Sequence, residues 1–540
     1  MYKKINFKYK IAGVSGKWAG ISFSWAGVMG LMLATGLNSC TKKYSDLNTN
    51  PSAIATITPA QYPQMFAYAQ QTVTLSPDNF EIGEGAIASM YSQFFGQAAG
   101  FNTDRYGIQQ TWLPAAWNPA YVSAAPQLRT IMAGTDAASA QNAVANIWWV
   151  WTFHRITDYF GPVPYTQAAS GQRYIAYDSQ DSIYYDFFKR LTAAVTVLNN
   201  HKGEKPFGTF DLVYGKQSDP VSAWIKFANT LRLRLAMRIS NVNPTLARTQ
   251  AEAAVAAGVM TDISTDAYMQ KTNATYNEEN GLSVIAGWED IRMSATMASI
   301  QKGYNDPRMP VFFQPATATG VFNGMRNGLS DDEKNNIVAN TSTNTSNLGT
   351  RWCTFSSGIW HAVYTTPQDL MHAAEAYFLR AEGALNGWNM GDNAQNLYVT
   401  GIKTSMAQWG ITDANLINTY VNNTATPIAP GDGMNSAPVN DYPVLWSSDA
   451  TMQRQQVAQQ KWLALWPDGM EGWAEVRRTD LPKLYPVLHS DNADVPVGTT
   501  IKRMPFLQAE ILVNADAVTK AVQLLGGPDN AATRLWWDVK

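Results

Sequence analysis

Carboxylates stand close together at several places in the chain, and paired carboxylates can do acid–base chemistry. The pairs are Glu81 with Glu84, Glu278 with Glu279, and Glu289 with Asp290. A glycosidase needs two carboxylates that face each other across the scissile bond, roughly 5–10 Å apart. Neighbouring acids in irregular segments are usually solvated, and none of these pairs stands in a motif that fixes a catalytic role. The sequence therefore predicts no catalytic residue.

Histidines are scarce, and their spacing gives little support for a metal centre. The chain has five, and only His154 with Asp158 has the i, i+4 spacing that places two side chains on one helix face. No H-E-x-x-H motif occurs, so we expect a structural pair. The sequence has no P-loop and no G-x-S-x-G elbow, and Gly83-x-Gly85 lacks the flanks of a nucleotide fingerprint. We expect no metal and no cofactor.

Aromatic residues give the strongest compositional signal. Phe, Trp and Tyr make up 12% of the 540 residues, with 19 tryptophans, while charged residues reach only 15%. We expect most of these rings in the core and a handful on the surface, where rings stack on sugars or peptides. The net charge of −2 gives no indication of a nucleic-acid partner.

The first forty residues have the layout of an export signal. Residues 1–20 hold five lysines and no acidic residue, and residues 21–36 carry no charge. The apolar run is shorter than the roughly 20 residues that a membrane-spanning helix needs. Leu37-Asn38-Ser39-Cys40 after it resembles a bacterial lipobox, so we predict a lipoprotein signal peptide over 1–39, lipidation of Cys40 and a flexible tether over 40–58. A plain membrane anchor is the alternative hypothesis.

Lipidation of Cys40 would leave Cys353 without a disulfide partner, because the chain has only two cysteines. Secreted proteins usually avoid reactive free thiols. Cys353 stands close to Trp352 and Phe355, so we expect it to be a small buried hydrophobic side chain.

Helical periodicity dominates the chain after the tether. Apolar residues recur every three or four positions, and capping residues mark several starts: Asp178 or Ser179 for one helix, and Asp219 followed by Pro220 for the next. The expected helices span 178–198, 219–240 and 366–387, with others near 60–75, 139–159, 392–408, 450–466 and 508–525.

Long irregular segments separate these helices. They span 96–120, 261–293, 303–350 and 423–448. Loops of this length are uncommon in a compact domain unless they bind something. Strand signals are few and short, such as the apolar run at 309–314. We predict a mostly α-helical single domain over 59–540, with elaborate loops and few short strands.

Several segments of the sequence form recognisable motifs. They are "ITDYFGPVPYTQA" (156–168), "NDPRMPVFF" (305–313), "AEAYFLRAEGALNGW" (374–388), "EGWAEVRRTDLPKL" (471–484), "RMPFLQAEILVNADAV" (503–518) and "TRLWWD" (533–538). In this order, after a lipobox, they resemble the SusD/RagB family of nutrient-binding outer-membrane lipoproteins of the Bacteroidetes. The resemblance covers essentially the whole chain after Cys40 and is closer to the SusD-like branch with the "WWD" ending than to the starch-binding founder.

The resemblance implies a scaffold of tetratricopeptide-type helix pairs, with a loop-rich ligand-binding part laid over it and no catalysis. It implies an outer-membrane, lipid-anchored protein on the cell surface that captures oligosaccharide or peptide. The implied partner is a SusC-like TonB-dependent transporter, which such a protein covers as a lid. Two other hypotheses stay open: a surface glycosidase, and a helical scaffold that binds another protein.

The resemblance also implies where ligand is held, namely in loops after the first helices and in the middle of the chain. Here these places are 100–107 and 272–292, with 358–364 as a third wall. Each mixes rings with amides and charges, as a stacking surface with polar groups requires. The residues expected to stack are Phe101, Tyr106, Tyr276, Trp288 and Trp360, and those expected to hydrogen-bond are Asn102, Arg105, Asn277 and Asn280.

For any one of these rings, pinning a loop to the scaffold is an equally good explanation. The low charge of the chain favours a neutral glycan but does not decide between glycan and peptide. Other residues of these motifs are expected to be structural. Tyr159 and Phe160 should pack around the turn that follows them, and Arg477 and Arg478 should pair with carboxylates or carbonyls.

Overall fold

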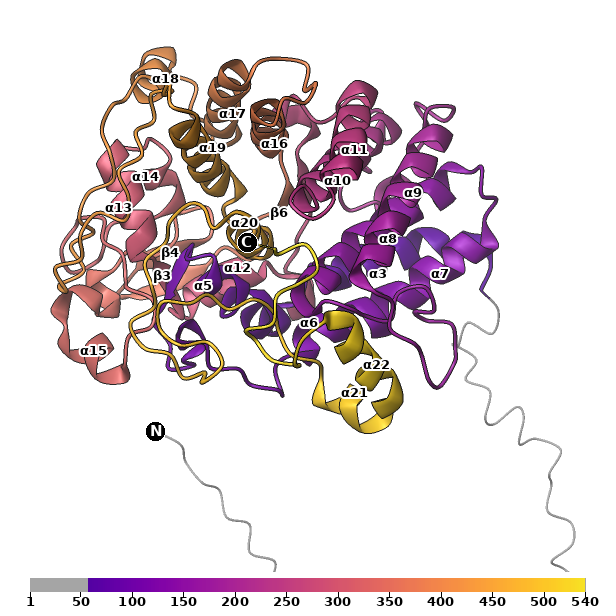
Figure 1. Cartoon of the computed structure of the whole chain (residues 1–540), viewed down its shortest axis with the longest axis horizontal. Coiled ribbons are helices and arrows are strands. Elements are labelled where there is room, and N and C mark those ends of the chain that lie inside the picture. The colour runs from indigo at the N-terminus through magenta and orange to yellow at the C-terminus, as the bar shows by residue number, and fades with distance from the viewer. Residues whose placement is uncertain (1–56, 540) are drawn as a thin grey trace, which may run out of the picture. The chain divides into compact units, whose positions relative to one another are not determined.

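Helices form the scaffold of the protein, and long irregular segments lie around them (Figure 1). The structure, a computed structural model, describes residues 57–539. In the first half of the chain the helices are α3 (Tyr62–Val73), α4 (Pro77–Phe80), α5 (Ala88–Tyr91), α6 (Pro114–Asn118), α7 (Ala125–Gly134), α8 (Ala140–Phe160), α9 (Gln180–Leu198), α10 (Pro220–Arg238) and α11 (Pro244–Ala257). In the second half they are α12 (Gly281–Gly287), α13 (Ala295–Tyr304), α14 (Met309–Phe312), α15 (Asp331–Asn336), α16 (Ala373–Leu385), α17 (Ala394–Gln408), α18 (Ala414–Val421), α19 (Ala450–Leu465), α20 (Gly469–Thr479), α21 (Gln508–Val513) and α22 (Ala515–Leu525).

Strands are short, and within residues 57–539 they pair two at a time in antiparallel fashion. The pairs are β1 (Phe95–Gln97) with β3 (Ile291–Met293), β2 (Ala267–Met269) with β6 (Gln368–Met371), and β4 (Cys353–Ser356) with β5 (Ile359–Ala362). The prediction of a mostly helical chain with few short strands is confirmed.

Capping residues begin the long helices as the sequence predicts. The Asp219 carboxylate accepts a hydrogen bond from the backbone N–H of Ser222 (3.0 Å), and Pro220 lies in the first turn of α10. Proline suits this turn because its missing N–H would have no partner within the helix. Ser179 occupies the N-cap position of α9, but its side chain makes no capping hydrogen bond there and donates to Asp181 instead.

Neighbouring helices pair along the chain. α3 packs on α7, α8 on α9, α10 on α11 and α16 on α17, while α10 also contacts α9 and α16. Figure 1 shows this row running from α9 through α10 and α11 to α16 and α17. α8 and α10 are buried on nearly all sides, as expected for helices in the middle of such an array.

Three predicted elements need correction. The strand expected at 309–314 is wrong: residues 309–312 form α14, and Phe313 makes only a single antiparallel bridge to Leu348. A short apolar run does not distinguish a strand from a buried helical turn. The helix expected over 508–525 is broken at Asn514, whose side-chain amide donates to the carbonyl of Ile175 (2.9 Å).

The helix expected over 366–387 begins seven residues late, at Ala373. Residues 368–371 form β6 instead, because they pair with β2. The Asp266 carboxylate accepts from the backbone N–H of Ala373 (2.7 Å) and so fixes the start of α16. Short helices also interrupt the segments expected to be irregular: α6 lies in 96–120, α12 in 261–293, and α14 and α15 in 303–350.

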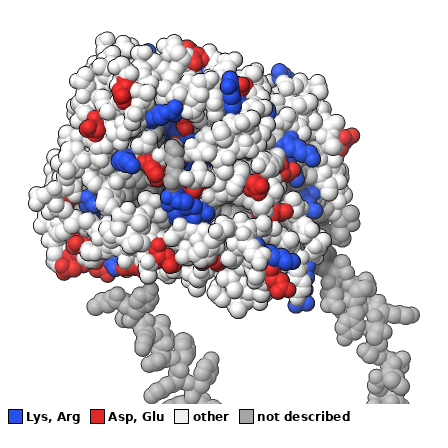
Figure 2. Space-filling view, viewed as in Figure 1, with Lys and Arg blue, Asp and Glu red and all other residues white. Residues whose placement is uncertain are grey.

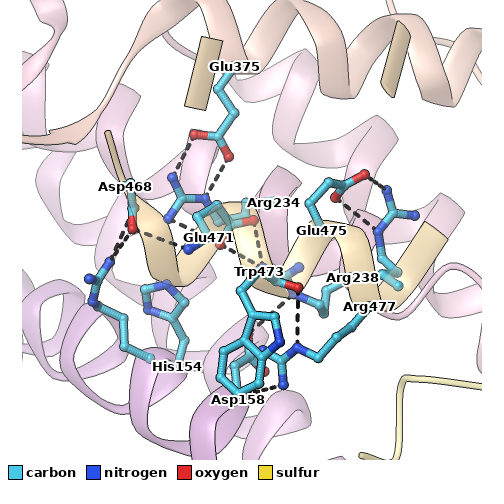
Figure 3. Close-up of polar contacts among 12 residues, drawn as sticks. His154, Asp158, Arg234, Arg238, Glu375, Asp468, Glu471, Trp473, Glu475 and Arg477 are labelled. Atoms are coloured by element: carbon cyan, nitrogen blue, oxygen red, sulfur yellow. Dashed lines mark hydrogen bonds and ion pairs between the residues drawn. The ribbon is translucent and has the colours of Figure 1, made fainter. Parts of the chain in front are cut away.

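A buried network of ion pairs joins the helices at the centre of the scaffold (Figure 3). Arg234 of α10 lies between Glu375 of α16 (2.6 Å) and Glu471 of α20 (3.7 Å). Arg238 of α10 reaches Asp158 of α8 (3.2 Å) and Glu471 (2.6 Å). Breaking such a buried pair costs about 3–5 kcal/mol, since the remaining charge has no partner. The network therefore fixes how these helices fit together.

The structural roles expected for Arg477 and Arg478 are confirmed. Arg478 makes ion pairs with Glu382 and Glu475, both at 2.7 Å. Arg477 donates to the backbone carbonyls of Asp158 (2.8 Å) and Lys502 (2.7 Å). Both arginines are buried.

Two aromatic side chains at the end of α8 also have the structural packing roles that the sequence predicts. Tyr159 and Phe160 are buried, and the Tyr159 hydroxyl donates to the carbonyl of Gly83 (3.0 Å). The Tyr159 ring packs edge-on against Trp473 of α20.

The pairing expected between His154 and Asp158 is wrong, although both side chains are buried in the scaffold. His154 Nδ1 lies 2.7 Å from the carbonyl of Trp151, within its own helix. The Asp158 carboxylate instead accepts from the Tyr184 hydroxyl (2.6 Å) and from the Trp537 indole (2.8 Å). An i, i+4 spacing permits contact, but here donors from other elements occupy the Asp158 carboxylate.

The predicted signal peptide, Cys40 and the tether up to residue 56 lie outside the described residues. Within residues 57–539, no helix combines the length and the apolarity that crossing a membrane requires. Cys353 is buried as expected, and burial raises the pKa of its thiol to about 12. The thiol is therefore protonated and unreactive near neutral pH.

Candidate functional site

The short helix α12 supports one wall of the candidate site. Asn280 caps it, because its side-chain oxygen accepts from the N–H of Ser283 (2.9 Å) and its side-chain nitrogen donates to the carbonyl of Thr366 (2.9 Å). Asn280 is only 1% exposed, so its amide holds the fold and does not face solvent. Trp288 follows the last turn of α12 and is 46% exposed. The helix thus presents a tryptophan at the surface.

The hairpin formed by β4 and β5 supplies a second wall. Phe355 lies opposite Trp360 in the register, and their ring centroids are 5.0 Å apart. Trp360 and Ala362 lie on the same face of β5, because side chains alternate along a strand. An added Cβ on Gly287 would lie 3.1 Å from the Cβ of Ala362. This face of the hairpin therefore meets the end of α12 that carries Trp288.

A third segment approaches the same place from the turn before α12. The backbone N–H of Asn280 donates to the carbonyl of Tyr364 (2.8 Å), which joins this turn to the segment that follows β5. Tyr276, in the same turn, donates its hydroxyl to Asp78 of α4. The structure therefore brings the segments of five rings to one surface, which we name the aromatic platform: Tyr276, Trp288, Phe355 and Tyr364, each 42–46% exposed, and the partly buried Trp360.

The loop after β1 flanks the aromatic platform. The backbone N–H groups of Ala98 (2.9 Å) and Ala99 (3.2 Å) both donate to the carbonyl of Asp290, two residues beyond Trp288. Phe101 in this loop packs edge-on against Trp112, with ring centroids 5.3 Å apart, and both rings are partly exposed. The sequence argument missed Trp112, although its place between polar Gln110–Thr111 and Pro114 resembles the other ring-bearing loops.

The remaining expected ligand residues have other surroundings. Arg105 makes an ion pair with Asp491 (2.5 Å), and Asn102 begins the same tight turn with a left-handed backbone at φ +59°. Asn277 is exposed beside Tyr276. Tyr276 and Asn277 thus precede α12 and Trp288 follows it, whereas Asn102 and Arg105 belong to the flanking loop.

Tyr106 lies in a separate cleft of about 730 Å³. Its ring is buried against Tyr91, and its hydroxyl donates to the carbonyl of Thr499 (3.3 Å). Lys483, Lys502 and Arg534 are among the residues that line this cleft. Figure 2 shows Lys and Arg side chains around the middle of the viewed face, while Asp and Glu gather along its lower left edge, where α15 lies in Figure 1.

The carboxylates that the sequence suggests as pairs take other partners in the fold. Glu84 is buried and pairs with Arg155 (2.9 Å). Glu289 pairs with Arg292 (2.7 Å). Glu278 accepts from the hydroxyls of Thr272 and Thr275. None of these neighbours therefore forms the facing pair that was considered.

A different carboxyl pair forms beside the aromatic platform. Glu81 lies in a π-helical turn after α4 and hydrogen-bonds to Asp290. Burial, this bond to Asp290 and the charge of Asp78 together raise the pKa of Glu81 to about 8. Burial also raises the pKa of Asp290. Two carboxyl groups this close resist ionising together, which favours a proton on the pair near neutral pH.

The sequence also matches a known protein family over most of its length. The family model of SusD-like proteins, described as SusD and RagB outer-membrane lipoproteins, matches residues 46–538. The chain belongs to the SusD/RagB family. Among curated proteins, none matches it.

Solved structures of other family members are similar over their whole length. A chitin-binding SusD homologue from Flavobacterium johnsoniae is 34% identical, with a TM-score of 0.79, over 89% of this chain and 98% of that one. A SusD-like protein from Bacteroides thetaiotaomicron is 30% identical, with a TM-score of 0.78, over 89% and 99%. A SusD homologue from Bacteroides vulgatus is also 30% identical, with a TM-score of 0.78, over 89% and 98%. The tetratricopeptide-like helical fold expected of a SusD/RagB member is confirmed.

Proposed function

We propose that this SusD/RagB member is a lipid-anchored protein of the cell surface that captures oligosaccharide on the aromatic platform without cleaving it. The observation that best supports this proposal is the surface exposure of four large aromatic side chains. Tyr276, Trp288, Phe355 and Tyr364 are each 42–46% exposed. Grouped exposed apolar side chains mark binding sites. A relative at 34% identity is a chitin-binding protein, which favours a glycan over a peptide.

Sugar rings present apolar C–H faces, and tyrosine and tryptophan rings cover such faces while their polar atoms stay hydrated. Trp288 and Trp360 come from different walls of the platform, so one ligand chain can contact both. Asn277 and the carboxyl groups nearby supply hydrogen-bonding partners for hydroxyls.

A glycosidase is less well supported, because the carboxyl pair beside the platform has the wrong spacing. The two carboxyl groups of a glycosidase stand about 5–9.5 Å apart, since the glycosidic bond or a water molecule must fit between them. Glu81 and Asp290 hydrogen-bond to each other directly. Such a contact is closer than the spacing of either glycosidase class.

Isothermal titration of the soluble protein with chitin oligosaccharides tests the binding site. Trp288→Ala and Trp360→Ala should each weaken binding by roughly 1–3 kcal/mol, the value of a ring whose face the ligand buries. Tyr185→Ala is the matched control, because Tyr185 of α9 is also 43% exposed but lies on the scaffold. Unchanged affinity in both tryptophan variants, with normal folding, would rule out the platform. Product formation during the titration would favour the glycosidase, and binding of peptides alone would favour peptide uptake.

We also propose that the protein delivers its ligand to a SusC-like TonB-dependent transporter in the outer membrane and covers it as a lid. The support is family membership, because the matching family is one of outer-membrane lipoproteins. Gentle detergent extraction of outer membranes, followed by affinity purification, should recover the two proteins together. Recovery of this chain alone, with the transporter present in the extract, would argue for a free-standing binder or scaffold.

A further inference from the structure

The loop that flanks the aromatic platform also borders a second cleft. Its first residues, Ala98 and Ala99, donate to the carbonyl of Asp290, whereas Tyr106 near its end lines the cleft of about 730 Å³. Tyr91 and Tyr485 line the same cleft, which we name the tyrosine cleft. Its volume lies within the range of about 300–1,000 Å³ that is typical of small-ligand sites.

Hydrogen bonds hold the walls of the tyrosine cleft in place. The side-chain amide of Gln93 donates to the carbonyl of Tyr485 (2.5 Å), and the Tyr106 hydroxyl donates to the carbonyl of Thr499 (3.3 Å). The two loops that carry Tyr485 and Thr499 are thereby fixed to the part of the chain that holds Gln93 and Tyr106. The protein's own contacts therefore form the cleft, as is usual for small-molecule sites.

The Tyr91 hydroxyl is a buried polar group of this cleft whose hydrogen-bonding capacity is unused. Tyr91 is 7% exposed, and its ring packs edge-on against Tyr106 (5.7 Å between centroids) and Trp473 (5.3 Å). Among residues 57–539 its hydroxyl has no hydrogen-bond partner. Buried polar side chains are nearly always paired. This hydroxyl is therefore available to a molecule that enters the cleft.

The charges around the tyrosine cleft balance one another. Lys502 and Arg534 line it, and both pair with the carboxylate of Asp538, at 3.3 and 2.6 Å. The other charged residues that line it are one cation and two acids: Lys483, Asp480 and Asp494. No sign of charge is in excess, so the cleft favours neither an anion nor a cation. Hydroxyl groups suit such a surface, because a hydroxyl can donate to a carboxylate and accept from a cationic side chain.

We propose that the tyrosine cleft is a second carbohydrate site, which takes a short neutral oligosaccharide whose hydroxyl groups pair with Tyr91 and with the charged side chains. Pro482, Leu484 and Pro486 line the same cleft as Tyr485 and offer apolar surface to the C–H faces of sugar rings. This site lies outside the aromatic platform, so the inference goes beyond the proposed function and does not depend on it.

The test first removes the aromatic platform, so that the tyrosine cleft is measured alone. The protein with both Trp288→Ala and Trp360→Ala is titrated with neutral trisaccharides from chitin, cellulose, starch and mannan, and ligand-observed NMR detects binding. At least one trisaccharide should bind saturably. Absence of binding by all four, in a variant that folds normally, overturns the inference and leaves the platform untouched.

Two further variants in this background assign the binding to the cleft. Tyr91→Phe should weaken it about three- to tenfold, through the loss of one hydrogen bond to the ligand. The melting temperature should stay nearly unchanged, since the hydroxyl has no protein partner. Thr500→Trp should abolish binding, because Thr500 is exposed and lines the cleft, where a large side chain takes the place of ligand. Thr249→Trp, at an exposed position of α11, is the matched control and should change neither quantity.

The outcomes for the two sites are distinguishable. Binding that is the same in Tyr91→Phe and Thr500→Trp as in their background overturns the inference, as does a preference for a uronic-acid trisaccharide over the neutral ones. With the platform intact, Thr500→Trp alone should still bind chitin oligosaccharide. If Thr500→Trp alone loses all binding while the tryptophan variants keep it, the tyrosine cleft stands and the platform fails.

Discussion

Lys271 is a buried lysine without an acidic partner, and its replacement by methionine should stabilise the protein. Its ammonium nitrogen lies 3.1 Å from the Thr74 hydroxyl and 3.4 Å from the carbonyl of Leu75. Within the described chain, no carboxylate is within ion-pair distance of it, and Glu278 acts only through its more distant charge. Burial therefore lowers the pKa of Lys271 from its usual 10.5 to about 7.

The lowered pKa sets both the size and the pH range of the effect. Because the folded state disfavours the protonated form of Lys271, this lysine destabilises the fold. The destabilisation is absent above about pH 10.5, grows as the pH falls and reaches its full size below about pH 7. A pKa shift of this size lowers the free energy of unfolding by about 4 kcal/mol at pH 7. Loss of the hydrogen bond to Thr74 offsets about 1–2 kcal/mol. We expect Lys271→Met to raise the free energy of unfolding by roughly 2–3 kcal/mol at neutral pH.

Urea denaturation of both proteins between pH 6 and pH 10 measures this difference directly. The advantage of the Lys271→Met variant should shrink as the pH rises, because the wild-type lysine then loses its proton in both states. Lys216→Met, at an exposed position, serves as the control and should show no such trend. A variant that is less stable at pH 7, or one whose advantage does not change with pH, would refute the reasoning.

Three further predictions concern the scaffold and the anchor. Tyr159→Ala should lower the free energy of unfolding by about 3–5 kcal/mol, as thermal or urea melts will measure, and should change ligand affinity only indirectly. His372 is buried, which lowers the pKa of its imidazole, but Asp266 and Asp369 outweigh this and raise that pKa to about 9. His372→Gln should therefore cost up to about 3 kcal/mol below pH 6.5, and this cost should disappear as the pH rises through 9. Cys40→Ala should abolish incorporation of labelled fatty acid, and labelling equal to that of the parent would contradict the lipoprotein hypothesis.

The scaffold could be predicted from the sequence where local signals agree with the packing. In α10, the Asp219–Pro220 start and the apolar spacing both point to the observed helix. The prediction failed where a distant partner decides: pairing with β2 converts residues 368–371 into a strand, and the amide of Asn514 leaves the helix to bind Ile175. Neither partner is close in the sequence.

The candidate site was only partly predictable for a related reason. Trp288 and Trp360 were proposed as stacking residues, and the fold brings their segments to one surface. Asn280 could have been recognised as a cap, because an asparagine before Gly281-Leu282-Ser283 is a typical helix start. The sequence around Tyr106 has the same mix of residue types as the sequence around the other rings, so only the fold could assign Tyr106 to a different cleft.

The ion-pair network at the centre of the scaffold has a consequence for the order in which the polypeptide becomes stable. Arg234 and Arg238 belong to the first half of the chain, but their partner Glu471 is added near its end. A chain that is truncated before α20 would have to bury two arginines without that carboxylate. We therefore expect N-terminal fragments to stay unfolded and sensitive to proteases until α20 is present, so that the domain folds as one cooperative unit and not helix by helix.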